Sequence, residues 1–142
     1  MPGSRVQLSR RVEFAAAHRY RRPDWSDERN RAVFGACANP NFHGHDYTCT
    51  VTVRGAIDET TGMIVDLAAL DRILDDEITS RFDHRNINLD VPEFADGGLV
   101  PTGENIARFI FERLEPRLPA GVELVRVDLA EDETLSATVE AR

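Results

Sequence analysis

The sequence contains no lysine. All 17 basic residues are arginine, and 25 acidic residues bring the net charge to −8. Schiff-base chemistry on a lysine and a phosphate-binding loop built around one are therefore excluded. An acidic chain is also a poor binder of nucleic acid, so we expect no nucleic-acid partner. Residues 1–31 depart from this balance with eight arginines against four acidic side chains, and this basic segment could receive a small polyanion.

Long apolar runs and numerous cysteines are also absent. Because no run of about 18 apolar residues could span a bilayer, we expect no membrane partner. The N-terminus lacks the apolar stretch and cleavage site of a signal peptide, which favours a cytoplasmic location. Cys37 and Cys49 are too few for a disulfide framework, so any special role of either must be chemical. The length of 142 residues and the hydrophobic content of 42% predict one folded domain, residues 1–142.

Hydrophobic periodicity predicts six elements along the chain. Alternating apolar residues indicate strands in four segments, Val6–Ala16, His43–Ile57, Val125–Leu129 and Leu135–Val139. Helical spacing runs from a possible cap at Asp66 to about Phe82, and from the cap Thr102 to about Leu114. The order ββααββ predicts an α+β fold, with two helices on one face of an antiparallel four-stranded sheet.

Two segments between these elements are predicted as loops. Residues 19–41 are rich in arginine, asparagine and proline, with one possible short helix from Asp27 to Phe34. Long ordered loops are often functional, which makes this segment a candidate part of a site. Residues 83–100 contain two asparagines and two glycines and are interpreted as a second loop.

Three of the four histidines predict a metal site. His43 and His45 share one face of the second strand, with Gly44 between them. His18 ends the first strand, so antiparallel pairing of the two strands would bring its imidazole beside the others. A single histidine is more often an ordinary core or surface residue, but three converging imidazoles favour a ligand set. Three nitrogen ligands with an open fourth position suit zinc best, while iron, nickel and copper also accept imidazole.

The two cysteines are expected to differ in role. Cys49 alternates with apolar residues in the second strand and is interpreted as a small core residue. Cys37 lies in the polar loop six residues before His43. A divalent cation and arginines nearby would lower its pKa and let it act as a base or nucleophile, although these residues alone also fit an ordinary loop thiol.

Asp83 and His84 form a candidate proton-transfer pair after the first helix. Because they are adjacent, their side chains can share a hydrogen bond only if the backbone turns. A carboxylate that holds an imidazole in one tautomer prepares it for proton transfer. A solvated helix C-terminus, where a cation is favourable, explains the pair equally well.

Glu131 follows the third strand and is a candidate ligand-binding carboxylate. There it could accept two hydrogen bonds from an N–H pair such as the edge of a guanine or pterin ring. Taken alone, a turn glutamate is the simpler interpretation. Thr102 and Glu104 could assist, but a helix cap and an acidic first turn also explain them.

These motifs, taken in order, resemble the 6-pyruvoyltetrahydropterin synthase family over nearly the full chain. The similar segments are Phe14–His18, Cys37–Tyr47, Gly62–Asp66, Phe82–Asn88, Pro101–Asn105 and Glu131. The resemblance implies the tunnelling fold (T-fold), in which four-stranded sheets from several subunits close into a barrel. It also implies active sites at subunit interfaces, typically in a homohexamer built from two trimers.

The family reaction is a lyase step of tetrahydrobiopterin biosynthesis. In it, 7,8-dihydroneopterin triphosphate loses inorganic triphosphate and rearranges to the 6-pyruvoyl product without an external redox cofactor. The implied roles are Zn²⁺ ligands for His18, His43 and His45, general base for Cys37, proton relay for Asp83 and His84, and pterin contacts for Glu131, Thr102 and Glu104. The basic segment around Arg19, Arg21 and Arg22 would then receive the triphosphate.

Two other functions stay open. The related 6-carboxy-tetrahydropterin synthase of the queuosine pathway uses the same substrate and zinc site. Five residues, Ala38 to Phe42, separate Cys37 from His43, which is similar to the biopterin branch, whereas the queuosine branch commonly has a shorter gap. A non-catalytic zinc- or pterin-binding protein is the third possibility, and the joint presence of Cys37, Asp83 and His84 argues against it.

Overall fold

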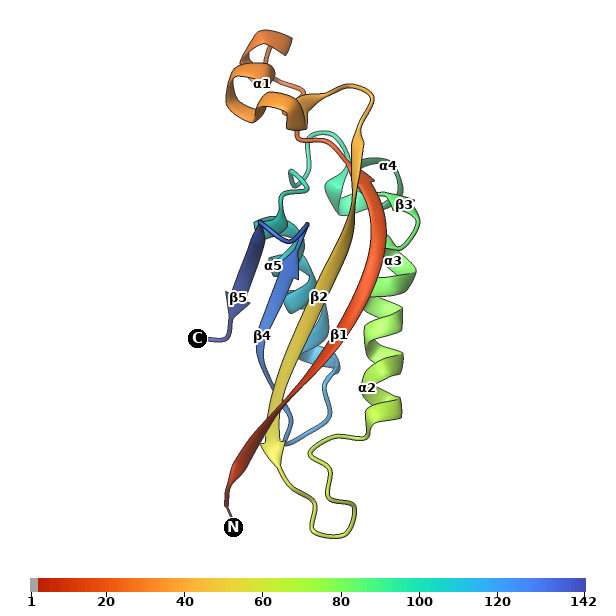
Figure 1. Ribbon diagram of the computed structural model, residues 1–142, viewed down its shortest axis with the longest axis vertical. Coiled ribbons are helices and arrows are strands. Elements are labelled where there is room, and N and C mark those ends of the chain that lie inside the picture. The colour runs from red at the N-terminus through yellow and green to blue at the C-terminus, as the bar shows by residue number, and fades with distance from the viewer. Residues whose placement is uncertain (1–2) are drawn as a thin grey trace.

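The computed structural model describes residues 3–142 and contains one five-stranded sheet in the order β3-β1-β2-β4-β5 (Figure 1). The strands are β1 (Arg5–His18), β2 (His43–Ala56), β3 (Arg85–Asn86), β4 (Glu123–Ala130) and β5 (Ser136–Glu140). Pairing is antiparallel throughout, except that β3 runs parallel to β1. The α+β class is confirmed, but the prediction of a four-stranded sheet was wrong, because the sheet has a fifth strand, β3. A two-residue strand is too short to produce a detectable alternation.

Within the described part of the chain, five α-helices accompany the sheet. They are α1 (Asp27–Phe34), α2 (Leu67–Leu74), α3 (Ser80–Phe82), α4 (Ile87–Asp90) and α5 (Gly103–Leu114). A π-helical turn at Asp75–Thr79 joins α2 to α3, so the helical stretch predicted up to Phe82 is confirmed. The order ββααββ is incomplete, because α1 lies between β1 and β2, and because β3 and α4 occupy the segment predicted as a second loop. The Asn86 side chain accepts a hydrogen bond from the Leu89 N–H and caps α4.

The predicted caps and alternation explain the main elements. Asp66 caps α2 through the Ala68 N–H, and Thr102 caps α5 through the Asn105 N–H. The buried apolar side chains of β2 belong to one core cluster with those of α2, α3 and α5, and these helices lie on one face of the sheet (Figure 1). The register shifts between Thr52 and Val53 of β2. This bulge buries Leu124 and leaves Val125 only half-buried, contrary to the predicted parity of β4.

The β1–β2 ladder positions the candidate site. It pairs Arg5 with Ala56 at one end and His18 with His43 at the other, and it places Ala16 opposite His45. The loop that carries α1 sits above the histidine end of this ladder (Figure 1). No helix within residues 3–142 has the length and apolar character needed to cross a membrane.

Candidate active site

Three histidines converge where β1 ends and β2 begins. One nitrogen from each of His18, His43 and His45 lies within 4.8 Å of the other two. The ring centroid of His18 is 4.6 Å from that of His43 and 5.1 Å from that of His45. The predicted convergence is therefore confirmed, and it follows from the register, which pairs His18 with His43 directly. The cluster could hold a metal ion.

The hydrogen bonds of His18 fix its tautomer. Its imidazole is fully buried, and Nδ1 lies 2.9 Å from the carbonyl oxygen of Pro101 and 3.0 Å from the hydroxyl of Tyr47. Because a carbonyl can only accept, Nδ1 carries the hydrogen and donates it, which leaves the Nε2 lone pair for a metal. Burial, together with the neighbouring His43 and His45, lowers the pKa of His18 to about 4.

The state of His43 also suits a metal. Burial and the charge of His45 lower the pKa of His43. A lowered pKa favours the neutral imidazole, which is the form that binds metal. Among the residues that the structure describes, the cluster offers three imidazole nitrogens, a ligand set that suits a metal ion with a further position open.

Gly44 allows the strands to approach each other beside the cluster. A Cβ atom built on Gly44 would lie 3.2 Å from the carbonyl oxygen of Ala16, closer than most side chains tolerate. A larger residue would therefore push β1 and β2 apart between the two histidines of β2. This close approach explains why a residue without a side chain occupies position 44.

Glu131 lies beside the histidine cluster at the end of β4. Its side chain is only 6% exposed, and Oε2 lies 4.0 Å from Nε2 of His45. Oε1 accepts a hydrogen bond of 3.1 Å from the Tyr20 hydroxyl. A Cβ on Gly103 would lie 3.5 Å from Oε1, so the carboxylate borders the N-terminus of α5, where the helix dipole favours negative charge. A groove of about 750 Å³ is lined by both His45 and Glu131.

Thr102 and Glu104 flank Gly103 at the start of α5. The Thr102 hydroxyl accepts a hydrogen bond of 3.1 Å from the Asn105 N–H and so acts as the helix cap. Glu104 is exposed, and its charge is one of the smaller influences that raise the pKa of Tyr20; burial is the largest. Contact of either residue with a pterin stays a prediction.

Cys37 lies on the other side of Tyr20, in a 3₁₀ helix over Gly35–Ala38. Its carbonyl oxygen accepts a hydrogen bond of 2.7 Å from the Tyr20 N–H. Burial and then the Glu131 carboxylate raise the pKa of the Cys37 thiol, opposite to the lowering expected from the sequence. Burial is the larger cause and the Glu131 carboxylate the second, and no arginine contributes to the shift, since Arg19, Arg21 and Arg31 line a pocket that does not include Cys37.

Cys49 behaves as the sequence predicted. It is fully buried among the apolar side chains of β2, and burial raises the pKa of its thiol to about 12. A thiol that stays protonated in the core is a poor nucleophile.

Asp83 and His84 lie together on the outer edge of β1. His84 has a left-handed φ of +60°, and this turn brings its Nδ1 to 3.0 Å from Asp83 Oδ2. Ala15 holds the pair, because its N–H donates to Asp83 Oδ1 and its carbonyl accepts from the His84 N–H. The hydrogen bond from Ala15, followed by that from His84, lowers the pKa of Asp83. The turn that such a pair requires is thus present.

The position of His84 suggests how it could act. Its side chain is 85% exposed, and with Gly44, His45 and Asp46 it lines a shallow groove of about 530 Å³. Cys37 does not line this groove. Within one chain, Asp83 and His84 therefore lie near the histidine cluster but not beside the Cys37 thiol.

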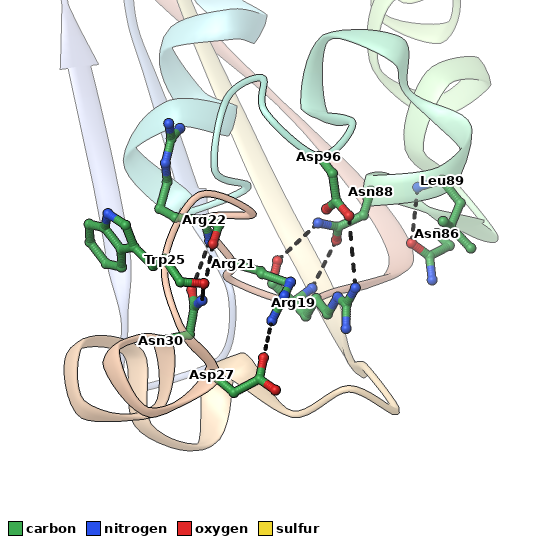
Figure 2. A network of polar contacts seen from close by, with 10 residues as sticks. All are labelled: Arg19, Arg21, Arg22, Trp25, Asp27, Asn30, Asn86, Asn88, Leu89 and Asp96. Carbon is green, nitrogen blue, oxygen red and sulfur yellow. Dashed lines mark hydrogen bonds and ion pairs between the residues drawn. The ribbon is translucent and has the colours of Figure 1, made fainter.

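The basic segment forms a pocket of about 350 Å³ lined by Arg19, Arg21 and Arg31. Arg21 pairs with Asp27 at 3.0 Å, and Arg19 lies 4.0 Å from Asp96 (Figure 2). Arg22 points away toward Asp24 and does not line the pocket. His18 belongs to the histidine cluster and Tyr20 contacts Glu131 beside it. Arg19 and Arg21 alternate with these residues along the chain and line the separate pocket.

Two groups in the site were not found from the sequence. Tyr20 lies two residues after His18, so strand-like alternation would put both side chains on the same face. The sequence contains no other indication of its role. The Pro101 carbonyl has no side-chain signal, since any residue could supply a backbone oxygen. The Tyr20 hydroxyl hydrogen-bonds Glu131, and the Pro101 carbonyl hydrogen-bonds His18.

Known proteins resemble this chain along most of its length. The family model described as "6-pyruvoyl tetrahydropterin synthase" matches residues 7–142. The chain is 47% identical to the 6-pyruvoyl tetrahydrobiopterin synthase of Pongo abelii, covering 89% of this chain and 85% of that protein. It is also 47% identical to the synthase of Homo sapiens, over 82% and 79% of the two chains. The structure of the Caenorhabditis elegans 6-pyruvoyl tetrahydropterin synthase superposes with a TM-score of 0.89 at 35% identity, covering 98% of this chain and 97% of that one.

Proposed function

The chain belongs to the 6-pyruvoyl tetrahydropterin synthase family, and on this premise we propose that it is a zinc-dependent lyase. The proposed reaction converts 7,8-dihydroneopterin triphosphate to 6-pyruvoyl-tetrahydropterin with elimination of inorganic triphosphate. The observation that carries the proposal is the position of the buried Glu131 carboxylate, 4.0 Å from one histidine of a three-histidine cluster. A tetrahydrobiopterin-forming pathway in the cytoplasm is the corresponding setting.

His18, His43 and His45 would hold the zinc ion. Bound zinc would polarise oxygen atoms of the substrate side chain and make the adjacent C–H bonds more acidic. The hydrogen bond from His18 to Pro101 holds that imidazole in the tautomer suited to this role.

Glu131 would bind the pterin ring. An ionised carboxylate can accept two hydrogen bonds from a planar N–H pair, and the edge of the pterin ring presents such a pair. Thr102 and Glu104 would border the ring at the start of α5. The groove lined by His45 and Glu131 would then hold the ring at one end, with its side chain beside the histidine cluster.

Cys37, Asp83 and His84 would carry out the proton transfers. Cys37 would act as the base, and the positive charge of the metal would offset the burial that raises its pKa. Asp83 would orient His84 through the 3.0 Å contact, and the imidazole would move the remaining protons.

We propose that neighbouring subunits complete each site. Within residues 3–142, β3 covers only Ala16 and Ala17 of the outer edge of β1, and the outer edge of β5 has no strand partner. Open edges of this kind readily pair with another chain. An assembly in which sheets join edge to edge, as in the T-fold homohexamer, would bring the exposed His84 of one subunit toward a thiol of the next.

The arginine pocket would receive the triphosphate. Guanidinium groups match phosphate oxygens in pairs, and Arg19 and Arg21 line a pocket that includes none of the cluster histidines. We therefore assign them to the substrate of an adjacent site. Replacement of Arg19 or Arg21 should raise KM for the triphosphate substrate, and an unchanged KM would reject this role.

Product analysis tests the proposed reaction. Zinc-loaded protein is incubated with 7,8-dihydroneopterin triphosphate, and the products are identified by mass spectrometry. The 6-pyruvoyl product with free triphosphate is expected. A 6-carboxy product with acetaldehyde would assign the chain to the queuosine branch, and pterin binding without turnover would leave a non-catalytic binding protein.

A further inference from the structure

We propose that Tyr20 is a positioning residue for Glu131, which fixes the orientation of the carboxylate that receives the pterin ring. The inference rests on the proposed function, because it concerns how the ring-binding group is held. It assigns a role to a side chain that takes no part in metal binding or in the proton transfers described above.

The Tyr20 hydroxyl reaches the carboxylate directly. It donates a hydrogen bond of 3.1 Å to Oε1 of Glu131. A carboxylate can only accept, so the direction of this bond is unambiguous. Oε2 lies on the side of the histidine cluster, 4.0 Å from His45 Nε2. The hydroxyl therefore holds one oxygen and turns the other toward the groove.

Tyr20 is itself held at three points. Its backbone N–H donates to the Cys37 carbonyl at 2.7 Å. Its ring meets the edge of His18 with centroids 5.2 Å apart, and the ring of Phe34 with centroids 5.8 Å apart. These contacts come from three different elements, so the hydroxyl is a fixed donor and not a mobile surface group.

A fixed donor restricts a carboxylate that would otherwise rotate. Glu131 follows β4 directly, and its backbone N–H is held by the Leu135 carbonyl at 3.0 Å, but its side chain has three rotatable bonds. A planar N–H pair can donate two good hydrogen bonds only if the carboxylate plane coincides with the ring plane. Tyr20 holds that plane before the substrate arrives, which reduces the ordering cost of binding.

The test compares the only two tyrosines of the chain. Tyr20→Phe removes the hydroxyl from Glu131 and keeps the ring against His18 and Phe34. Tyr47→Phe removes the hydroxyl from His18. Tyr20→Phe should raise both KM for 7,8-dihydroneopterin triphosphate and Kd for the product analogue biopterin about tenfold, the loss expected for a hydrogen bond to a charged group. Its kcat should stay within about threefold and its zinc content should not change.

Tyr47→Phe should show the opposite pattern, with weaker zinc retention and little change in Kd for biopterin once zinc is saturating. A double variant separates positioning from general damage. In a Glu131→Gln background, Tyr20→Phe should weaken biopterin binding less than threefold further, because the charged acceptor is already gone. Circular dichroism and thermal unfolding confirm that each variant is folded.

Three outcomes overturn the inference. They are a Kd for biopterin in Tyr20→Phe equal to that of the unmodified protein, an equal loss in the Glu131→Gln background, and a loss of zinc comparable to that of Tyr47→Phe. The proposed function fails separately, if the unmodified protein binds biopterin without turning over the triphosphate. In that case the Kd comparison still decides the role of Tyr20, and absence of both turnover and biopterin binding in the unmodified protein would overturn both.

Discussion

His18 and His43 are direct partners in the last pair of the β1–β2 ladder, and their ring centroids are 4.6 Å apart. His45, two residues further along β2, faces the same side and completes the cluster. Because strand pairing sets these distances, the ligand geometry depends on the two longest strands of the fold and not on a mobile loop.

Replacement of one cluster histidine should remove the metal. His45→Ala should weaken zinc affinity by at least about 100-fold, since even outer-shell changes cost 10- to 100-fold. Metal analysis after equilibrium dialysis measures the effect. The matched control is His84→Ala, the one histidine outside the cluster, which should retain zinc. Equal zinc content in the two variants would contradict the assignment of His45 as a ligand.

Metal-free protein should lose stability as the pH falls from about 6.5 to about 4. Burial lowers the pKa of His18 to about 4, whereas the unfolded chain titrates near 6.5, so the unfolded state binds the extra proton in this range. The free energy of unfolding should fall by about 3 kcal/mol over that interval. Urea unfolding of chelator-treated protein at several pH values measures it. His18→Gln should flatten the curve, and identical curves for both proteins would refute the explanation.

Gly44→Ala should weaken the metal site without removing a ligand. The new methyl group would lie 3.2 Å from the Ala16 carbonyl oxygen, and the strands must separate slightly to accept it. We expect about tenfold weaker zinc binding and about 1 kcal/mol lower stability. Gly103→Ala is the matched control, because its methyl group would meet Glu131 at an ordinary distance of 3.5 Å. Zinc titration of the two variants should differ accordingly, and equal affinities would argue against the close approach.

Removal of a proton-transfer group should lower turnover and spare the metal. Cys37→Ala and His84→Ala should each reduce kcat by at least about 100-fold, with zinc content unchanged. If neighbouring subunits share each site, unfolding and refolding the two variants together should restore part of the activity, because mixed assemblies contain some intact sites. Full activity in Cys37→Ala would remove Cys37 from the mechanism, and no recovery on mixing would indicate sites built within one chain.

The sequence predicted those elements that are long enough for their apolar pattern to repeat several times. Alternation over β2 and the caps Asp66 and Thr102 were sufficient to locate a strand and two helices. β3 and α4, with two and four residues, are too short for an apolar pattern to repeat. The bulge at Val125 of β4, opposite Thr52 and Val53, could not be predicted either, because it depends on how β2 pairs with β4.

The candidate site shows the same division. The spacing of His43 and His45 predicted a shared face, and antiparallel pairing then predicted the approach of His18. The direction of the Cys37 pKa was not predictable, since it depends on burial and on a carboxylate 94 positions away in the sequence. The hydrogen bond between Tyr20 and Glu131 likewise exists only after the chain has folded.

Zinc titration of metal-free protein, followed by turnover of 7,8-dihydroneopterin triphosphate, tests the central claim most directly. The three-histidine cluster predicts that formation of the 6-pyruvoyl product is absent without zinc, rises in proportion to added zinc and reaches a plateau at about one ion per chain. Full turnover by protein shown to be free of metal would contradict the account.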